Sequence, residues 1–198
     1  MKIMKKINLI ILLLSVLNSK AQTPIINNLD WNGVSIPNSY VKDINNDMNQ
    51  FVGTYVYQNN GVYFKIILKK VTMVPYITFF ADLIVGEFEY LDINNTVSTL
   101  SEIDIIYDDE YLHNIAGLSL IENNQDFPCN DCLLNEKRMN LFFSDTQVGS
   151  DLIIRRTIIG GNEVLKAFRR TINVGHRVGD NYISNIVPDG EYILIKQP

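Results

Sequence analysis

The chain has 198 residues, of which 46% are apolar and 20% are charged, and its formal net charge is −5. An apolar content this high excludes a disordered chain, and 11 Gly, 6 Pro and 2 Cys exclude collagen-like, low-complexity and disulfide-dense classes. What remains is a globular domain long enough to bury a sizeable apolar core.

The N-terminus has the pattern of a secretory signal peptide over residues 1–21. Its positive region holds Lys2, Lys5 and Lys6. The apolar run that follows, over residues 7–17, is shorter than the roughly 20 residues that span a bilayer. Small residues at positions 19 and 21 then predict cleavage between Ala21 and Gln22. The pattern predicts export through the inner membrane, to the periplasm or the medium.

Cleavage at this site would make the chain more acidic. It removes four lysines and leaves 13 cations against 22 acids, a net charge of −9. A chain this acidic is a poor partner for nucleic acids and anionic membrane surfaces, so neither is expected. The mature chain also has no apolar run long enough to form a transmembrane segment.

The elements change in character at residue 51. Residues 22–50 are rich in Asn and predict a loop-like lead-in with a short helix over residues 41–50. Residues 51–198 consist of short alternating apolar runs and form a single predicted β domain. The expected strands cover residues 51–57, 62–70, 76–90, 96–107, 115–121, 139–143, 152–159, 163–172 and 192–196. Hairpin turns are expected at Asn60-Gly61 and at residues 160–162, and Gly86 is a candidate break in the third run.

No segment after residue 51 keeps a helical period for three turns, so the predicted fold class is all-β, an antiparallel barrel or sandwich. Residues 51–55, Phe-Val-Gly-Thr-Tyr, resemble the Gly-x-Trp signature that opens the first strand of lipocalins, with Tyr55 in place of Trp. The resemblance implies an antiparallel lipocalin-like barrel of about eight to nine strands after a short N-terminal helix.

A longer resemblance covers most of the chain. It is carried, in order, by Ala-Gln at 21–22, Trp-Asn-Gly at 31–33, residues 42–47, the Cys129–Cys132 segment and residues 135–138. Together these resemble an uncharacterised family of small secreted proteins from flavobacteria and related Bacteroidetes, which carries a domain-of-unknown-function label. The resemblance implies secretion and a lipocalin-like barrel, and it supplies no activity and no binding residues.

Cys129 and Cys132 form a C-x-x-C pair. In an exported protein two cysteines at this spacing are typical of a small-loop disulfide. A redox site needs a βαβ context, and a zinc site needs two more ligands where the chain offers only His113 and His176. The disulfide is the leading interpretation, with the redox pair, the metal site and free thiols as alternatives.

Two polar stretches resemble calcium loops in part. Residues 43–49 lack the Gly and the Glu that an EF-hand needs at positions six and twelve, where Met48 and Thr54 stand. Residues 28–33 lack the Glu, since Ser39 stands at position twelve. We therefore predict a polar surface at both places, no metal and no cofactor.

Charge is distributed unevenly along the chain. Residues 155–177 hold six cations and one acid, whereas residues 102–110 hold five acids and no cation. One interpretation is that the two segments are neighbours or that both lie on solvated strand faces. The alternative is that the cations bind a ligand. If residues 160–162 form a three-residue loop, Arg156 shares a strand face with Phe168 and Arg170. The opposite face carries Arg155 and Arg169, and the sequence does not choose which face points inward.

An inward-facing cation in an apolar cavity suits a carboxylate on an apolar tail. The candidate ligand-lining residues are Tyr55, Phe64, Ile66, Arg156, Phe168 and Arg170. No catalytic motif is present, and two separated histidines offer little for a triad, so no catalytic residue is predicted. The first hypothesis is a non-enzymatic protein that binds a small apolar, amphiphilic or anionic ligand. The alternative is a structural or interaction protein of the envelope or surface with a solidly packed barrel, and a hydrolase is the third.

Overall fold

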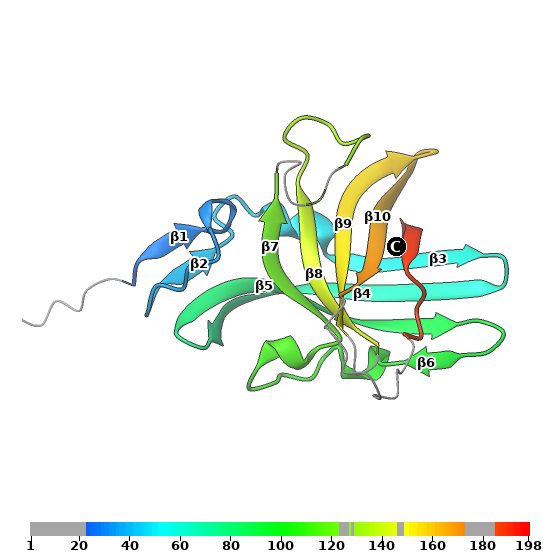
Figure 1. The fold of residues 1–198 in the computed structure, drawn as a ribbon, viewed down its shortest axis with the longest axis horizontal. Coiled ribbons are helices and arrows are strands. Elements are labelled where there is room, and N and C mark those ends of the chain that lie inside the picture. The colour runs from blue at the N-terminus through cyan, green and yellow to red at the C-terminus, as the bar shows by residue number, and fades with distance from the viewer. Residues whose placement is uncertain (1–22, 123–126, 128, 146–148, 173–184) are drawn as a thin grey trace, which may run out of the picture.

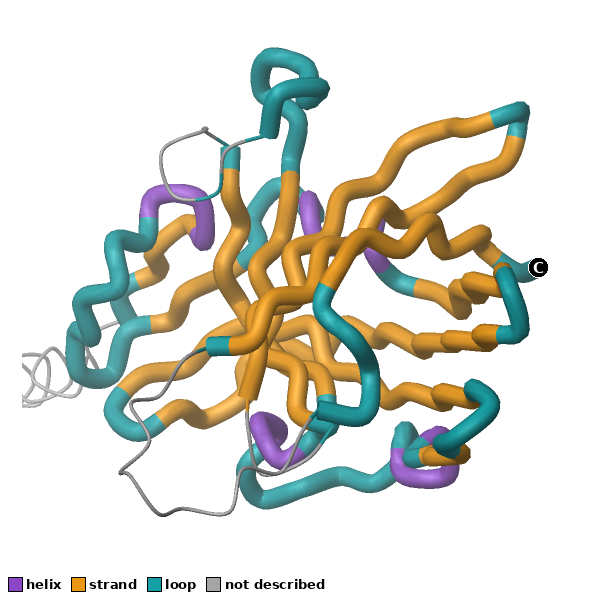
Figure 2. The backbone as a smooth tube through the Cα atoms, turned by 45° about the vertical axis from the view of Figure 1, so that its right-hand side comes forward, coloured by secondary structure: helices purple, strands orange, loops and turns teal. Residues whose placement is uncertain are grey.

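The computed structural model describes residues 23–122, 127, 129–145, 149–172 and 185–198. The predicted signal peptide, with its cleavage site between Ala21 and Gln22, lies outside these residues. Among the described residues, no helix has the length and apolar character needed to cross a membrane. Strands make up most of the described chain, and helical turns appear only in the connections (Figure 2).

Eight antiparallel strands close into a barrel (Figure 1). They are β3 (Gly53–Asn59), β4 (Val62–Tyr76), β5 (Phe79–Leu91), β7 (Ile115–Ile121), β8 (Arg138–Ser144), β9 (Gly149–Ile159), β10 (Asn162–Thr171) and β11 (Gly190–Lys196). Each strand pairs with the next in this series, and β11 returns to pair with β3. The predicted all-β antiparallel barrel is therefore confirmed.

In two of the hairpins, a two-residue turn joins the two strands. Asn60 and Gly61 connect β3 to β4 with φ of +50° and +79°. Gly160 and Gly161 connect β9 to β10 with φ of +57° and +82°. Two consecutive left-handed residues make the tight turn whose twist matches that of the flanking strands, and Asn and Gly adopt this conformation at least cost.

The lead-in contributes strands, and the helix predicted over residues 41–50 is wrong. β1 (Ile25–Asn27), followed by the 3-10 turn η1 (Asn28–Asp30), pairs in parallel with β2 (Tyr40–Lys42). β2 in turn pairs in parallel with β5, so both strands lie beside the barrel (Figure 1). Because this pairing uses residues 40–42, only a single 3-10 turn follows, η2 (Asp47–Phe51). Its first N–H groups, those of Asp47 and Met48, donate to the Asp43 carboxylate over 2.8 and 3.0 Å.

The strand predicted over residues 96–107 is also wrong for most of its length. Only β6 (Thr96–Ser98) pairs with β5, and the chain then forms the 3-10 turns η3 (Leu100–Glu102) and η4 (Glu110–Leu112). Asp104 of this segment pairs with Lys69 on the outer face of β4. The alternation at residues 103–105 therefore belongs to a loop that covers part of the sheet.

β5 continues through Gly86 without the break that the sequence suggested. Gly86 pairs with Leu68 of β4, and a Cβ at position 86 would lie 2.5 Å from the carbonyl oxygen of Ile67. The glycine is needed because the two backbones approach closely there, not because the strand bends or ends.

Aromatic rings fill the interior of the barrel. The Phe64 ring centroid lies 6.1 Å from those of Tyr90 and Phe143, and 5.2 Å from that of Tyr192. Phe88 lies 4.9 Å from Phe143. Phe64 and Phe143 come from β4 and β8, which are not neighbours in the sheet, so their contact spans the interior. These rings stack edge-on or tilted and occupy the barrel at this level.

Buried side chains also occupy the two ends of the barrel. At one end, Met48 and Phe51 of η2 are fully buried, and the Tyr55 hydroxyl donates to the carbonyl of Val52 over 3.3 Å. Burial raises the pKa of Tyr55 to about 12. Toward the other end of β10, the fully buried Arg169 points inward and pairs with Asp145.

Candidate functional site

The register of β9 and β10 decides which predicted ligand-lining residues share a face. Because the turn has two residues and not three, Arg156 pairs with Leu165, and Ile153 pairs with Phe168. The expectation that Arg156 shares a face with Phe168 and Arg170 is therefore wrong. A difference of one residue in the turn moves every side chain of one strand to the other face.

The other predicted lining residues separate into two groups. Tyr55, Phe64 and Ile66 point into the filled barrel and have no exposed surface. Phe168 and Arg170 lie on the outer face and are partly exposed, at 42% for Phe168. Arg156 has the inward orientation but lies toward the turn, where it pairs with Glu163 over 2.9 Å. The structure thus does not bring the six residues together.

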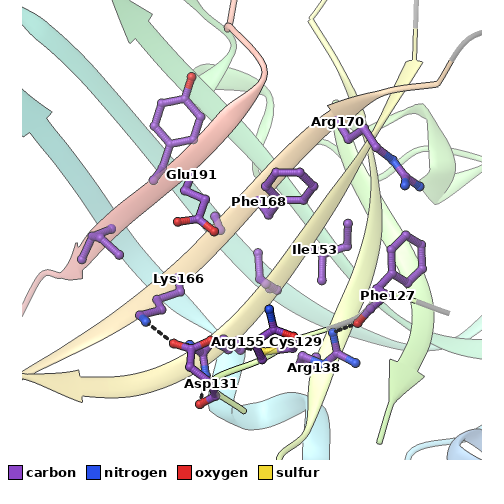
Figure 3. A pocket seen from close by; sticks show the side chains of 15 residues that line it. Phe127, Cys129, Asp131, Arg138, Ile153, Arg155, Lys166, Phe168, Arg170 and Glu191 are labelled. Carbon is purple, nitrogen blue, oxygen red and sulfur yellow. Dashed lines mark hydrogen bonds and ion pairs between the residues drawn. The ribbon is translucent and has the colours of Figure 1, made fainter. Parts of the chain in front are cut away.

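A groove lies on the outer face of β8 to β11, beside the loop that precedes β8 (Figure 3). It has a volume of about 490 Å³, which lies within the range of small-molecule sites. Ile153, Phe168 and Ile193, from three neighbouring strands, form its apolar floor. Its charged residues are Asp131, Arg138, Arg155, Lys166, Arg170 and Glu191. Cations therefore outnumber acids in this groove, whereas acids outnumber cations in the whole chain.

Three of these cations form a row across the sheet. Arg155 of β9 pairs in register with Arg138 of β8 on one side and with Lys166 of β10 on the other. Like charges directly opposite each other repel, so the row needs anions between its members. Asp131 and Glu136, from the loop before β8, supply them.

The contacts of Asp131 hold the loop against this row. Its carboxylate pairs with Arg155 and lies 2.7 Å from the Lys166 ammonium. Its backbone carbonyl accepts a further hydrogen bond from Arg155 over 3.3 Å. Hydrogen bonds from Lys166 and Arg155 lower the pKa of the Asp131 carboxyl. Glu136 pairs with Arg155 over 3.2 Å.

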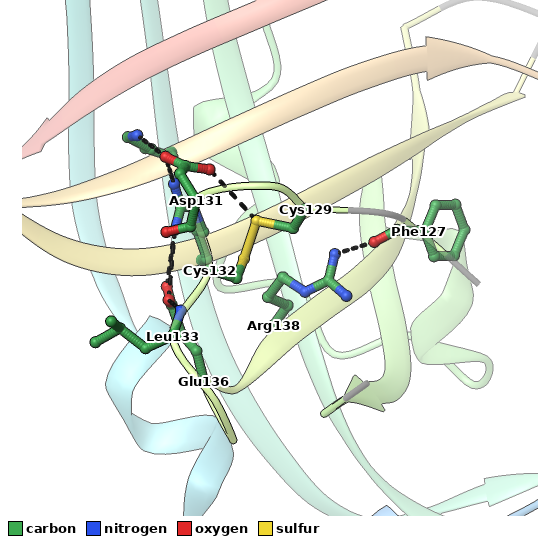
Figure 4. Close-up of a disulfide and its surroundings, with 9 residues drawn as sticks. Phe127, Cys129, Asp131, Cys132, Leu133, Glu136 and Arg138 are labelled. Atoms are coloured by element: carbon green, nitrogen blue, oxygen red, sulfur yellow. Dashed lines mark hydrogen bonds and ion pairs between the residues drawn. A yellow bond between two sulfur atoms is a disulfide. The ribbon is translucent and has the colours of Figure 1, made fainter. Parts of the chain in front are cut away.

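A disulfide closes the loop segment that carries Asp131 (Figure 4). Cys129 and Cys132 are bonded, as the C-x-x-C spacing predicts, and their Cα atoms lie 5.4 Å apart. Asp131 lies within the four-residue ring, and the Leu133 N–H donates to the Glu136 carboxylate over 2.8 Å just after it. The bond therefore keeps the acid close to the cations.

Arg170 borders the groove farther along β10. It pairs with Asp151 on the neighbouring strand over 2.7 Å, and its guanidinium lies 5.3 Å from the centroid of the Phe127 ring. Its side chain is 54% exposed, so its ion pair faces water and is weak. An anion in the groove can reach this guanidinium without entering the protein.

The sequence matches a family described as "Family of unknown function (DUF6705)" over residues 4–197. The chain belongs to this family. No curated protein and no solved structure matches the sequence.

Two buried polar clusters lie elsewhere in this DUF6705 chain. The His113 ring nitrogens lie 2.7 Å from Glu87 and 3.2 Å from Glu110, and all three side chains are largely buried. Asp82 accepts hydrogen bonds from the Tyr40 hydroxyl over 2.5 Å and from the Asp43 N–H over 3.0 Å. These contacts tie the 99–114 segment and the lead-in to the barrel.

Neither cluster is arranged for metal binding. Among the residues that the structure describes, no group of three or more His, Cys, Asp or Glu could hold a metal ion. The Asp43 carboxylate, a candidate calcium ligand by sequence, is occupied by two backbone N–H groups and by Lys70 at 2.7 Å.

Sequence reasoning missed most of the groove. The alternation of the hairpin assigns Ile153, Arg155 and Lys166 to its faces but does not show that they share an outer groove, and the C-x-x-C pattern gives no role to Asp131. The available signal was the charge imbalance of residues 155–177, which a partner acid on a distant loop partly satisfies.

Proposed function

We propose that this protein is a non-enzymatic binding protein that holds a small anionic amphiphile in the outer groove. The observation that carries the proposal is an apolar floor, exposed at Phe168 and Ile193, that is bordered by cations on a protein with an excess of acids. Apolar surface left open to water is favourable to cover, and a cation beside it selects an anionic head group.

Strand β10 presents the relevant side chains at regular intervals. Lys166, Phe168 and Arg170 follow one another on its outer face, so each cation lies about 7 Å along the strand from the ring. A ligand that covers Phe168 with its apolar part can therefore place its anion on Arg170, whereas Lys166, at the same spacing, is paired with Asp131. The Arg170–Asp151 pair offers little resistance because exposed ion pairs contribute at most about 1 kcal/mol.

We extend the proposal to location. The leader pattern of residues 1–21 and the Cys129–Cys132 disulfide are both typical of exported proteins, so we place the protein in the periplasm or the medium. The closed eight-stranded barrel with η2 at one end supports the prediction of a lipocalin-like barrel. In our proposal, however, the ligand binds on the outer face of the barrel and not in its centre.

The test uses dodecanoate as the probe and titration calorimetry as the measurement. We expect the full chain to bind dodecanoate and to bind dodecyl maltoside, which has a neutral head group, at least about tenfold more weakly. Phe168→Ala should weaken dodecanoate binding about tenfold, since it removes apolar contact area worth about 1.5 kcal/mol.

Phe142→Ala is the matched control, because Phe142 is 44% exposed and lies on the outer face of β8 without lining the groove. The affinity of the Phe142→Ala variant for dodecanoate should equal that of the wild type. Equal losses in both variants, or equal binding of the two probes, would refute the proposed site.

A second candidate function is an interaction protein. It is favoured by Leu133 and Leu134, which are 79% and 92% exposed directly after the disulfide. They border a second groove of about 680 Å³ that also includes Leu29, Trp31 and Leu120. Native mass spectrometry of the protein recovered from its own host separates the two functions: a small added mass supports the ligand, and a macromolecular one supports the partner.

A further inference from the structure

We propose that the Cys129–Cys132 disulfide is a redox latch on the outer groove. In the disulfide form, the Asp131 carboxylate pairs with both Arg155 and Lys166. Reduction by a dithiol releases Lys166 to the anionic group of the ligand and leaves Arg155 with Glu136. The regulatory part rests on the proposed function, since it describes how the same groove changes its affinity.

Asp131 occupies the place of a bound anion. Arg155 and Lys166 lie directly opposite each other on β9 and β10, and the Asp131 carboxylate contacts both. Arg155 is nearly buried, at 8% exposure, so it requires an anion nearby. Its second partner, Glu136, contacts Arg155 and not Lys166 among the ion pairs of the described residues.

Asp131 is held there by the covalent ring and is itself accessible. Its side chain is 64% exposed, and an exposed carboxylate on a free loop gains little from an ion pair. The disulfide changes this balance, because it fixes the Cα atoms of residues 129 and 132 at 5.4 Å, with Asp131 between them. Without the bond, the distance between the Cα atoms of residues 129 and 132 can increase to about 10 Å. Keeping the Asp131 carboxylate beside the cations then costs conformational entropy.

Reduction of the disulfide is chemically accessible. Cys129 borders this groove and Cys132 borders the second one, and both are partly exposed. A thiolate of the dithiol attacks one sulfur and displaces the other as a thiolate, which gives a mixed disulfide. The second thiol of the reagent then attacks this mixed disulfide. The protein gains two electrons and two protons as two thiols, and the reagent leaves as a cyclic disulfide.

A first experiment tests whether reduction exposes Lys166, without any ligand. The full chain is treated with a trace of an amine-acylating ester, with and without dithiothreitol, and acylation of each lysine is measured by peptide mass spectrometry. Loss of an exposed ion pair is worth up to about fivefold, so we expect acylation of Lys166 to rise about two- to fivefold on reduction. Lys69 is the control, because it pairs with the distant Asp104. An unchanged Lys166, or an equal rise at Lys69, would overturn the latch.

A second experiment measures the affinity of the groove for dodecanoate in variants that keep the disulfide intact. Asp131→Asn should tighten binding about tenfold, since it removes the competing charge, whereas Asp104→Asn makes the same change in net charge elsewhere and should have no effect. Reduction should tighten the wild type and leave Asp131→Asn unchanged.

The outcomes separate the two proposals. If no form of the protein binds dodecanoate while Lys166 responds to reduction, the proposed ligand is wrong and the opening of the loop remains. If the oxidised wild type binds dodecanoate and neither reduction nor Asp131→Asn alters the affinity, the groove remains and the latch is refuted.

Discussion

Arg169 and Arg170 are neighbours in the sequence and have opposite environments. Arg169 points into the barrel with no exposed surface, pairs with Asp145 and Asp189, and lies 5.4 Å from the Phe143 ring centroid. Arg170 points outward and is half exposed. Because water stabilises an unpaired charge only at the surface, loss of the same side chain has different consequences at the two positions.

Arg169→Met should lower the free energy of unfolding by about 3–5 kcal/mol, since it leaves the buried Asp145 carboxylate without its counter-ion. Arg170→Met should change it by less than about 0.5 kcal/mol. The double variant Arg169→Met/Asp145→Asn should recover at least about 1.5 kcal/mol, because the stranded charge is gone while an acceptor for the Val187 N–H remains. Urea denaturation measures all three, and a double variant no better than Arg169→Met would contradict the pairing.

At the scale of elements, one ion cluster joins the last strands of the barrel. Glu163 of β10 lies 2.9 Å from Arg156 of β9 and 2.6 Å from Lys196 of β11. Hydrogen bonds from these two cations lower the pKa of Glu163 to about 2. A carboxyl with a lowered folded pKa stabilises the protein above its unfolded pKa, and the contribution disappears as the pH falls toward the folded pKa.

Glu163→Gln should therefore destabilise the protein by about 1 kcal/mol at pH 7, less than the full shift implies because the cluster is in contact with water. The difference from the wild type should persist down to about pH 4.5 and shrink toward pH 2, where the wild-type carboxyl also becomes neutral. Urea denaturation at pH 7 and pH 2.5 measures it. Glu191→Gln, a change at an exposed glutamate of β11, is the control and should have no effect at either pH.

The same strands show what the sequence could and could not predict. Alternation placed the last five barrel strands to within three residues, because each has one face in a continuous core. It failed at residues 103–105, where alternating Ile and Asp cover the barrel from outside, since a pattern of two does not say what it packs against. It also failed on the face of β10, because Gly-Gly-Asn is compatible with a two- or a three-residue turn.

At the scale of the whole molecule, the interior and the groove have different roles. The interior holds Phe64, Phe88 and Phe143 in mutual contact, and the groove combines four strands with the loop that precedes β8. The barrel could be predicted from local patterns. The groove could not, because its floor depends on register and its cations depend on where Asp131 lies.

If the interior is filled as these contacts indicate, it should take up an apolar probe only after a ring is removed. Phe64→Ala should lower the free energy of unfolding by about 3–5 kcal/mol and leave a dry cavity among the remaining rings. Xenon should then shift the methyl NMR signals of Leu141 and Ile66 in this variant and not in the wild type, while Phe142→Ala on the outer face should behave like the wild type. Dodecanoate should still bind Phe64→Ala with wild-type affinity, because the groove lies on the other side of the sheet. Xenon uptake by the wild-type interior, or loss of dodecanoate binding in a folded Phe64→Ala protein, would return the ligand site to the centre of the barrel.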